Sequence, residues 1–383
     1  MSGKECWIEN PGGTRRVFVT QELPGRLWYE RLVAADCRVD MCLSTEPMTL
    51  EELLAMIGER CDGVIGQLTE PWGAAAFDAL ASAGGRAYSN YAVGYNNVDL
   101  AAATSRGIAV GNTPGVLTAT TAQLAVALTF AAARRVVEAH DHLAAGRYRG
   151  WLPTLFLGEL LWRKTVGVIG AGRIGAAYAR MMVEGHKMDL LYFDPHGNED
   201  LERYLADYGA FLERHGQRAV RCRRADSVDE VLREADVVSL HTVLSGETMH
   251  LIDARRLASM KPTAILINAS RGPIVDEAAL VAHCRAHPGF YAGLDVFEHE
   301  PELAPGLAEL PNIVGVPHIG SATSWTREGM ATLAASNVAA CLQGWPVWGK
   351  DDMTPFLGSA PPQAAPSIVN AAELGLPMYD GPS

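Results

Sequence analysis

Short apolar runs alternate with helical patterns along most of the chain. The runs are three to five residues long and lie at 16–19, 39–42, 63–66, 108–110, 165–169, 190–193, 237–240, 264–267, 291–295 and 313–316. Between two early runs, the segment 49–59 places Leu50, Leu53 and Ile57 on one helical face. This alternation predicts an α/β fold whose parallel sheets are flanked by helices.

Three segments depart from the alternation. Residues 116–146 are rich in Ala, Leu and Val, which predicts one long helix ending at Gly146. Residues 198–233 are crowded with charged side chains, which predicts a solvated helical excursion between two sheet strands, with a partner-binding surface as the alternative. Residues 351–383 carry an excess of Pro and Ala, which predicts an extended tail, either packed over the first domain or partly mobile.

Length and charge narrow the class of protein. A chain of 383 residues exceeds what one hydrophobic core usually holds, which favours two domains. Asp and Glu number 44 against 32 Lys and Arg, which disfavours binding to nucleic acid or to an anionic membrane surface. No apolar run approaches the roughly 18 to 20 residues that span a bilayer.

The cysteines and the chain ends say little about location. The seven Cys are scattered and lack metal-ligand spacing, which predicts thiols in a reducing compartment and no metal site. The C-terminal Asp380-Gly381-Pro382-Ser383 is not a peroxisomal Ser-Lys-Leu address. The compartment therefore stays open among cytoplasm, mitochondrion and peroxisome.

A strand runs directly into a Gly-x-Gly-x-x-Gly motif at Gly170, Gly172 and Gly175, and a helical pattern follows at once. Such glycines allow a tight turn and a close backbone approach to a pyrophosphate at the helix N-terminus. Asp194 follows the next strand, where a carboxylate binds adenosine ribose hydroxyls and repels the 2′-phosphate of NADP, and Pro195 offers no compensating guanidinium. The motif predicts NAD(H); an ordinary Gly-rich turn is the alternative.

One Arg, one Glu and one His lie just beyond three consecutive later strands. They are Arg271, Glu300 and His318. Open α/β sheets bind their ligands at the carboxyl ends of the strands. A guanidinium can hold the carboxylate and carbonyl oxygens of a 2-keto acid, and an imidazolium paired with a carboxylate can protonate a developing alkoxide. These residue types therefore predict hydride chemistry on a 2-keto or 2-hydroxy acid.

The motifs around these residues resemble the D-isomer-specific 2-hydroxyacid dehydrogenase family. They are Asn268-x-Ser270-Arg271-Gly272, Asp295-Val296-Phe297-x-x-Glu300-Pro301 and Pro317-His318-Ile319, together with the glycine motif. The resemblance implies two Rossmann-like domains: a discontinuous substrate domain, 1–117 with 325–383, and an NAD-binding domain, 118–324. It also implies a homodimer formed through the NAD-binding domain.

The resemblance implies roles residue by residue. His318 is the acid/base, Glu300 its carboxylate partner and Arg271 the substrate clamp. The residues implied to contact cofactor are Gly170, Gly172, Arg173, Ile174, Gly175, Asp194, Thr121, His241, Thr242, Ala269, Ser270, Arg271, Asp295, His318 and Gly320. Those implied to contact substrate are Val93, Gly94, Arg271, His318, Ser321 and Trp325. For His241, an ordinary structural histidine is an equal alternative.

Within the family, residues 1 to about 377 resemble the plant-type NADH-dependent hydroxypyruvate reductases. This implies reduction of hydroxypyruvate to D-glycerate, with glyoxylate as a secondary substrate. A glyoxylate or phosphoglycerate dehydrogenase, or a NAD-sensing binding protein of the corepressor kind, is the alternative. The apolar residues Trp151, Phe156, Leu157 and Trp162 fill either a dimer interface or the domain core. Glu298 and His299, which interrupt the second motif, are expected to be solvated.

Overall fold

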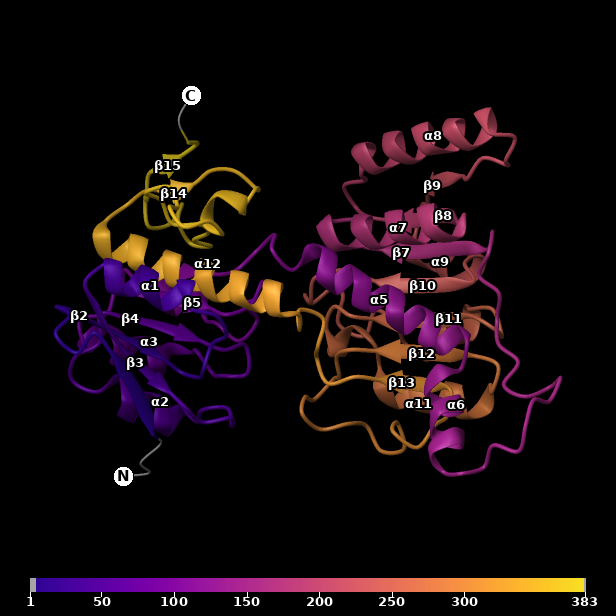
Figure 1. Cartoon of the computed structure of the whole chain (residues 1–383), viewed down its shortest axis with the longest axis horizontal. Helices are drawn as coiled ribbons and strands as arrows, with labels where there is room; N and C mark the ends of the chain where they lie inside the picture. Colours follow the sequence, from indigo (N-terminus) through magenta and orange to yellow (C-terminus); the bar gives the residue numbers. More distant parts are fainter. Residues whose placement is uncertain (1–4, 382–383) are drawn as a thin grey trace. The chain divides into compact units, whose positions relative to one another are not determined.

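The computed structural model describes residues 5–381. The chain forms two compact units, Met1–Leu117 with Ser321–Ser383, and Thr118–Gly320. Both are built on parallel strands with helices on their faces (Figure 1). The predicted α/β fold with parallel sheets is confirmed. Across residues 5–381, none of the helices is both long and apolar enough to cross a membrane.

The first unit contains a six-stranded sheet. Its strands, in the order β1-β3-β2-β4-β5-β6, are β1 (Cys6–Glu9), β3 (Cys37–Cys42), β2 (Arg15–Val19), β4 (Gly63–Gly66), β5 (Ala87–Asn90) and β6 (Ala109–Gly111). Only the edge strand β1 runs antiparallel to its neighbour within this sheet. Its helices are α1 (Leu27–Ala34), α2 (Leu50–Ile57), α3 (Ala74–Ser82), α4 (Leu100–Ser105) and α12 (Ser324–Gln343). Phe18, Val64 and Tyr88 pack on one face beneath α2 and α3.

The C-terminal tail is packed on the first unit. It contains β14 (Val347–Trp348), η2 (Thr354–Phe356) and β15 (Met378–Tyr379). The Oδ1 atom of Asn370 accepts a hydrogen bond from the backbone N–H of Val110 in β6 (2.9 Å), and Ser367 donates to Asn112 (2.6 Å). Of the two predicted alternatives for residues 351–383, the packed one is therefore correct for the part described.

The second unit contains a seven-stranded parallel sheet. Its order is β13 (Ile313–Gly315), β12 (Tyr291–Leu294), β11 (Ile265–Asn268), β10 (Val237–Leu240), β7 (Thr165–Ile169), β8 (Asp189–Phe193) and β9 (Cys222–Arg224). One face packs on α5 (Thr118–Ala133), α7 (Arg173–His186) and α8 (Glu199–Arg214). The other packs on α9 (Val228–Glu234), α10 (Ala254–Ser259) and α11 (Glu277–Ala286). The strand order reverses beside β7, where open sheets bind ligands.

Two predicted elements are wrong in detail. The single helix expected over 116–146 is two, α5 and α6 (Val136–Ala144), because Arg135 adopts a left-handed conformation (φ 53°) that interrupts the helix. The excursion expected over 198–233 is only partly solvated. Its helix α8 buries Leu201, Leu205 and Leu212, and its strand β9 extends the sheet beside β8.

Candidate active site

The turn that joins β7 to α7 is shaped by its glycines. Gly170 has φ +90°, and a Cβ there would lie 2.7 Å from the backbone carbonyl carbon of His241. A Cβ on Gly175 would lie 2.0 Å from the carbonyl oxygen of Gly170, so neither position admits a side chain. Gly172 is the N-cap residue of α7, without a side-chain cap, and a Cβ on it would meet no atom within 4 Å. The helix N-terminus thus faces a cradle that fits a pyrophosphate, with Arg173 and Ile174 in its first turn.

Asp194, at the end of β8, lies beside the same turn. Its Oδ2 accepts a hydrogen bond from the backbone N–H of Ala171 (2.9 Å), and its Oδ1 accepts one from that of His196 (2.9 Å). Each carboxylate oxygen has further lone-pair capacity for a ribose hydroxyl. Pro195 offers no guanidinium, as its sequence position indicates, but another strand brings one to this loop. Arg224 of β9 donates through Nη2 to the carbonyl oxygens of Asp194 and Pro195, both at 2.8 Å.

His318 and Glu300, which lie in separate loops, form a hydrogen-bonded pair. The Nδ1 atom of His318 lies 2.9 Å from Oε2 of Glu300, and Oε1 of Glu300 accepts the backbone N–H of Phe297 (3.0 Å). Burial raises the pKa of Glu300, but the hydrogen bond and charge of His318, the Phe297 N–H and the charge of Arg271 together bring it below its ordinary value. Glu300 is therefore an ionised partner that fixes the imidazole and leaves Nε2 for a reacting group.

Asp295 holds the segment that carries His318. Its carboxylate accepts the backbone N–H groups of Ile319 (2.6 Å) and Gly320 (2.9 Å), and its carbonyl oxygen accepts that of His318 (2.9 Å). His318 itself has φ 50°, a conformation that a non-glycine residue adopts at some energetic cost. Thr121 of α5 donates to the carbonyl oxygen of Gly320 (3.2 Å). Thr121, Asp295 and Gly320, three predicted cofactor contacts, thus lie together beside His318.

Arg271 follows β11 in a loop organised by Asn268. The Oδ1 atom of Asn268 accepts the backbone N–H and the hydroxyl of Ser270 (3.1 and 3.0 Å), and its Nδ2 donates to the carbonyl oxygen of Arg271 (2.9 Å). A Cβ on Gly272 would lie 1.8 Å from the carbonyl oxygen of Phe297, so this loop is in close contact with the loop leading to Glu300. Burial lowers the pKa of Arg271 and the charge of Glu300 opposes this, yet a guanidinium stays charged near neutral pH.

The remaining predicted cofactor residues lie at the ends of β10 and β11. His241 is next to the glycine turn, with Nε2 2.8 Å from the hydroxyl of Ser239, and burial lowers the pKa of His241 to about 3. It is thus a neutral histidine near neutral pH. Thr242 follows it with its hydroxyl directed at the backbone carbonyl of Val243, and Ala269 is buried immediately after β11.

The chain is similar to known proteins over most of its length. The family model described as D-isomer specific 2-hydroxyacid dehydrogenase, NAD binding domain, matches residues 126–320. A glycerate dehydrogenase of Cucumis sativus is 58% identical over 97% of this chain and 98% of its own length. A protein of Arabidopsis thaliana named glycerate dehydrogenase HPR, peroxisomal, is 56% identical over 97% of both chains.

The chain belongs to the D-isomer specific 2-hydroxyacid dehydrogenase family.

A solved structure of similar fold, the TT0316 protein of Thermus thermophilus, is 39% identical, covers 86% of this chain and 97% of its own, and superposes with a TM-score of 0.75. This dehydrogenase carries the family's NAD-binding domain across most of its second unit, and its cofactor is NAD(H). The cradle at Gly172 and the Asp194 carboxylate fit that cofactor on their own geometry.

The dehydrogenase's other predicted substrate residues lie in the first unit. The carbonyl oxygens of Val93 and Gly94 accept hydrogen bonds from Asn112 (2.8 Å) and Asn90 (2.9 Å). Within residues 5–381, the N–H groups of Val93 and Gly94 have no acceptor. The asparagines thus hold the loop so that two adjacent N–H groups are available to an anion. Trp325, at the start of α12, is 65% exposed, and Ser321 is half-buried.

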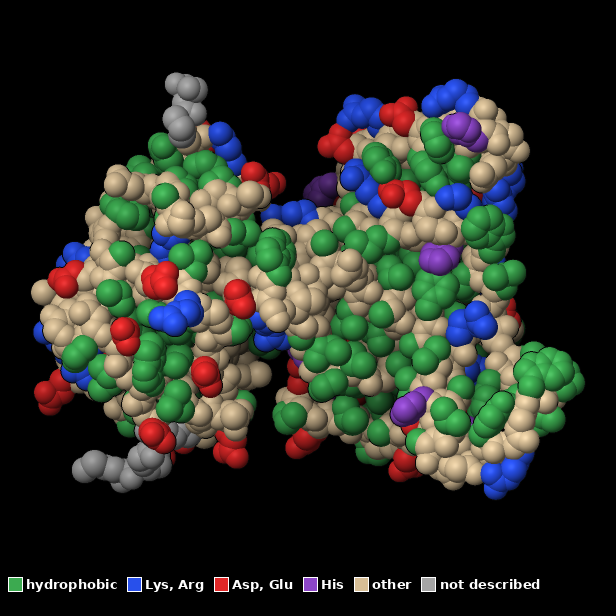
Figure 2. Space-filling view, viewed as in Figure 1, with side chains coloured by type: hydrophobic (Ala, Val, Ile, Leu, Met, Phe, Trp, Pro, Cys, Tyr) green, Lys and Arg blue, Asp and Glu red, His purple; other side chains and the backbone are tan. Residues whose placement is uncertain are grey.

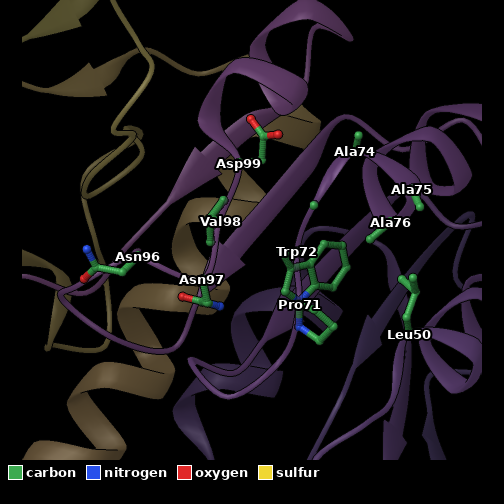
Figure 3. Close-up of a pocket in the computed structure, with 11 residues that line it drawn as sticks. Leu50, Pro71, Trp72, Ala74, Ala75, Ala76, Asn96, Asn97, Val98 and Asp99 are labelled. Carbon is green, nitrogen blue, oxygen red and sulfur yellow. The ribbon is translucent and has the colours of Figure 1, made fainter. Parts of the chain in front are cut away.

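A pocket of about 480 Å³ in the first unit lies next to that loop. It is lined by Trp72 and Pro71, by the start of α3 and by the segment from Asn96 to Asp99 (Figure 3). Its walls are largely apolar, and none of the residues predicted for catalysis or cofactor binding lines it. The described pocket therefore adds nothing to the chemistry of the site.

Some residues near the site escape sequence reasoning. Asn268 is part of a motif in the sequence, but its hydrogen bonds to Ser270 and Arg271 can be seen only in the structure. The expectation that Glu298 is solvated is wrong, because its side chain is only 17% exposed and its Oε1 lies 2.6 Å from Nε2 of His250. His299, by contrast, is exposed as expected. The dehydrogenase thus has a second His–Glu pair, distinct from His318 and Glu300.

Proposed function

We propose that this dehydrogenase reduces hydroxypyruvate to D-glycerate with NADH and reduces glyoxylate as a secondary substrate. The observation that carries the proposal is the pairing of His318 with an ionised Glu300, with Arg271 in the adjoining loop. Near full-length similarity to proteins named glycerate dehydrogenase supports the same substrate.

The residues supply the proton and the positioning. NADH, when bound, would supply the hydride that adds to the keto carbon and would be left as NAD⁺. The proton for the developing alkoxide comes from Nε2 of His318, and Glu300 stabilises the imidazolium until that transfer. Arg271 binds the carbonyl oxygen and carboxylate of the substrate through parallel N–H donors, which holds the carbonyl carbon for attack. One hydride and one proton together account for the reduction of the ketone to the alcohol.

We assign the two parts of the chain different roles. Residues 118–324 bind NAD(H), with Arg173, Ile174, His241 and Thr242 at the phosphates and Thr121, Ala269, Ser270, Asp295 and Gly320 toward the nicotinamide end. Residues 1–117 and 325–383 bind the substrate, whose carboxylate accepts the N–H groups of Val93 and Gly94. Ser321 and Trp325 complete the substrate site. The unit boundaries at Leu117 and Gly320 are consistent with this division.

We further propose a homodimer formed through the second unit. Trp151, Leu157 and Trp162 are exposed, at 82%, 66% and 46%, so they do not fill the core of their own unit. The helix α6 buries none of its residues. Hydrophobic side chains gather over α6 and the segment that follows it (Figure 2). Exposed apolar surface of this extent is typical of a protein–protein interface.

The substrate assignment is tested by following NADH absorbance with hydroxypyruvate, glyoxylate and phosphohydroxypyruvate. Fastest turnover with hydroxypyruvate is expected. Preference for phosphohydroxypyruvate indicates the phosphoglycerate alternative, and NADH binding without turnover of any of the three indicates a NAD-sensing protein.

The role of His318 is tested against the second His–Glu pair. His318→Ala is expected to lower turnover about 10² to 10⁴-fold, because it removes the proton donor. His250→Ala, which removes the other paired histidine, is expected to leave turnover within about twofold of wild type. Equal effects of the two substitutions would reject the assignment.

For the compartment, we propose a reducing one. Burial raises the pKa of the Cys61 thiol to about 11 and that of Cys284 to about 12, so these buried side chains are inert apolar groups. Immunofluorescence of the untagged protein against peroxisomal, mitochondrial and cytosolic markers identifies which compartment it is.

A further inference from the structure

Arg224 is held against the loop that follows Asp194. It lies opposite Tyr192 where β9 pairs with β8. Its Nη2 donates to two successive carbonyl oxygens, those of Asp194 and Pro195, both at 2.8 Å. A Cβ on Gly197, which has φ +71°, would lie 3.0 Å from Nη1 of Arg224, so the guanidinium lies directly over this turn. The side chain is thereby fixed against the backbone of Asp194, the residue whose carboxylate is expected to bind the ribose.

The charge of Arg224 is not neutralised by the protein. Across residues 5–381, no carboxylate lies within ion-pair distance of it, and its Nε and Nη1 have no acceptor. Its neighbour Arg223 differs in this respect, because its guanidinium binds the carboxylates of Glu230 and Glu234. Arg224 is also exposed to solvent. It is therefore a positioned cation with N–H groups to offer an anion from solution.

We propose that Arg224 is a specificity-determining residue that recognises the 2′-phosphate of NADPH and opposes the selection of NADH by Asp194. The proposal rests on NAD(H) binding by the second unit. The Asp194 carboxylate favours a 2′-hydroxyl, which donates to it, and repels a 2′-phosphate. A phosphate at that position also lies beside the Arg224 guanidinium, whose free N–H groups suit phosphate oxygens. Discrimination then reflects two opposing charges, and NADPH is disfavoured without being excluded.

The proposal is best tested by substituting Asp194 and Arg224 both singly and together. Asp194→Ala is expected to weaken NADH binding about tenfold, because it removes a charged acceptor, and to strengthen NADPH binding about tenfold. In Asp194→Ala/Arg224→Gln the gain for NADPH is expected to disappear. Gln retains an amide N–H for the two carbonyl oxygens but carries no charge. The substitution therefore removes the charge that would bind the phosphate while keeping a donor that can support the loop.

The test measures binding rather than turnover. Dissociation constants of NADH and NADPH are determined by calorimetry for wild type, Asp194→Ala, Arg224→Gln and the double variant, at low and high salt, with melting temperatures as the control for folding. Arg223→Gln is the matched control, because it removes an adjacent arginine whose charge is already paired. Arg224→Gln alone is expected to weaken the binding of NADPH severalfold and to reduce its salt dependence. The dissociation constant of NADH is expected to stay within about twofold of the wild-type value.

Three results would overturn the proposal. One is NADPH binding to the double variant as tight as to Asp194→Ala. Another is an equal loss of affinity for NADH and for NADPH in Arg224→Gln, which would mean that the side chain only supports the loop. The third is an effect of Arg223→Gln equal to that of Arg224→Gln. Because binding is measured directly, failure to turn over hydroxypyruvate would affect the proposed reaction and not this inference.

Discussion

The Glu300 carboxylate is paired with the imidazole of His318, so its charge should bear on the pH dependence of the proposed reduction. Glu300→Gln preserves the shape of the side chain and removes its negative charge. The pKa of Glu300 lies below its ordinary value, so the wild-type carboxylate is ionised over the whole useful pH range. The substitution therefore removes a full charge 2.9 Å from Nδ1 of His318. The protonated imidazole loses stabilisation, and reduction should fail at a lower pH.

The size of the effect follows from the exposure of the pair. A hydrogen bond to a charged group contributes about 1.5 to 3 kcal/mol when it is well shielded. The side chains of His318 and Glu300 are 30% and 27% exposed, so water screens them and the lower end of that range applies. About 1.4 kcal/mol corresponds to roughly one pH unit.

The assay is the initial rate of NADH consumption with saturating hydroxypyruvate over a series of pH values. The pH at which the rate falls to half on the alkaline side is expected to move down by about one unit in Glu300→Gln. Glu298→Gln is the control, because Glu298 faces His250 instead, and it should leave the profile in place. An unmoved alkaline limb in Glu300→Gln, or an equal shift in Glu298→Gln, would refute the reasoning.

Three further substitutions test other parts of the site and surface. Arg271→Lys replaces a planar fork by a point charge and should lower kcat/KM for hydroxypyruvate about 10²-fold while leaving the NADH dissociation constant unchanged. Gly175→Ala places a Cβ 2.0 Å from a carbonyl oxygen, so it should abolish NADH binding and lower the melting temperature. Gly185→Ala is the control on the same helix. Its Cβ meets nothing within 4 Å, so NADH binding and the melting temperature should stay unchanged. Trp151→Asp should convert the proposed dimer to a monomer in size-exclusion chromatography with light scattering, and a wild-type protein that elutes as a monomer would refute the proposed interface.

The parts of the fold that the sequence predicts are those whose signal is local. Strands such as Gly63–Gly66 and Val237–Leu240 are buried on both faces, so their apolar runs mark them clearly. The strand β9 consists of Cys222, Arg223 and Arg224 at a sheet edge, and its composition gives no such signal. The break between α5 and α6 depends on one backbone conformation, at Arg135, which an Ala-rich sequence does not disclose.

The site divides in the same way. Arg271, Glu300 and His318 stand in recognisable motifs at strand ends, so sequence alone selects them. That Nδ1 of His318 meets Oε2 of Glu300, and that Asp295 fixes the segment that carries His318, depends on three-dimensional packing. Arg224 escapes sequence reasoning because it reaches Asp194 from another strand, thirty positions along the chain.

The return of the chain to its first unit has a consequence for biosynthesis. The helix α12 and the tail that bonds to β6 come after the whole of the second unit, so the first unit lacks a major part of its core until the second unit has been synthesised. The second unit is continuous and has no such delay. Domains generally fold as units, so the nucleotide-binding unit should fold first on the ribosome. Residues 1–117, although made earlier, should complete their folding only when α12 and the tail have been synthesised.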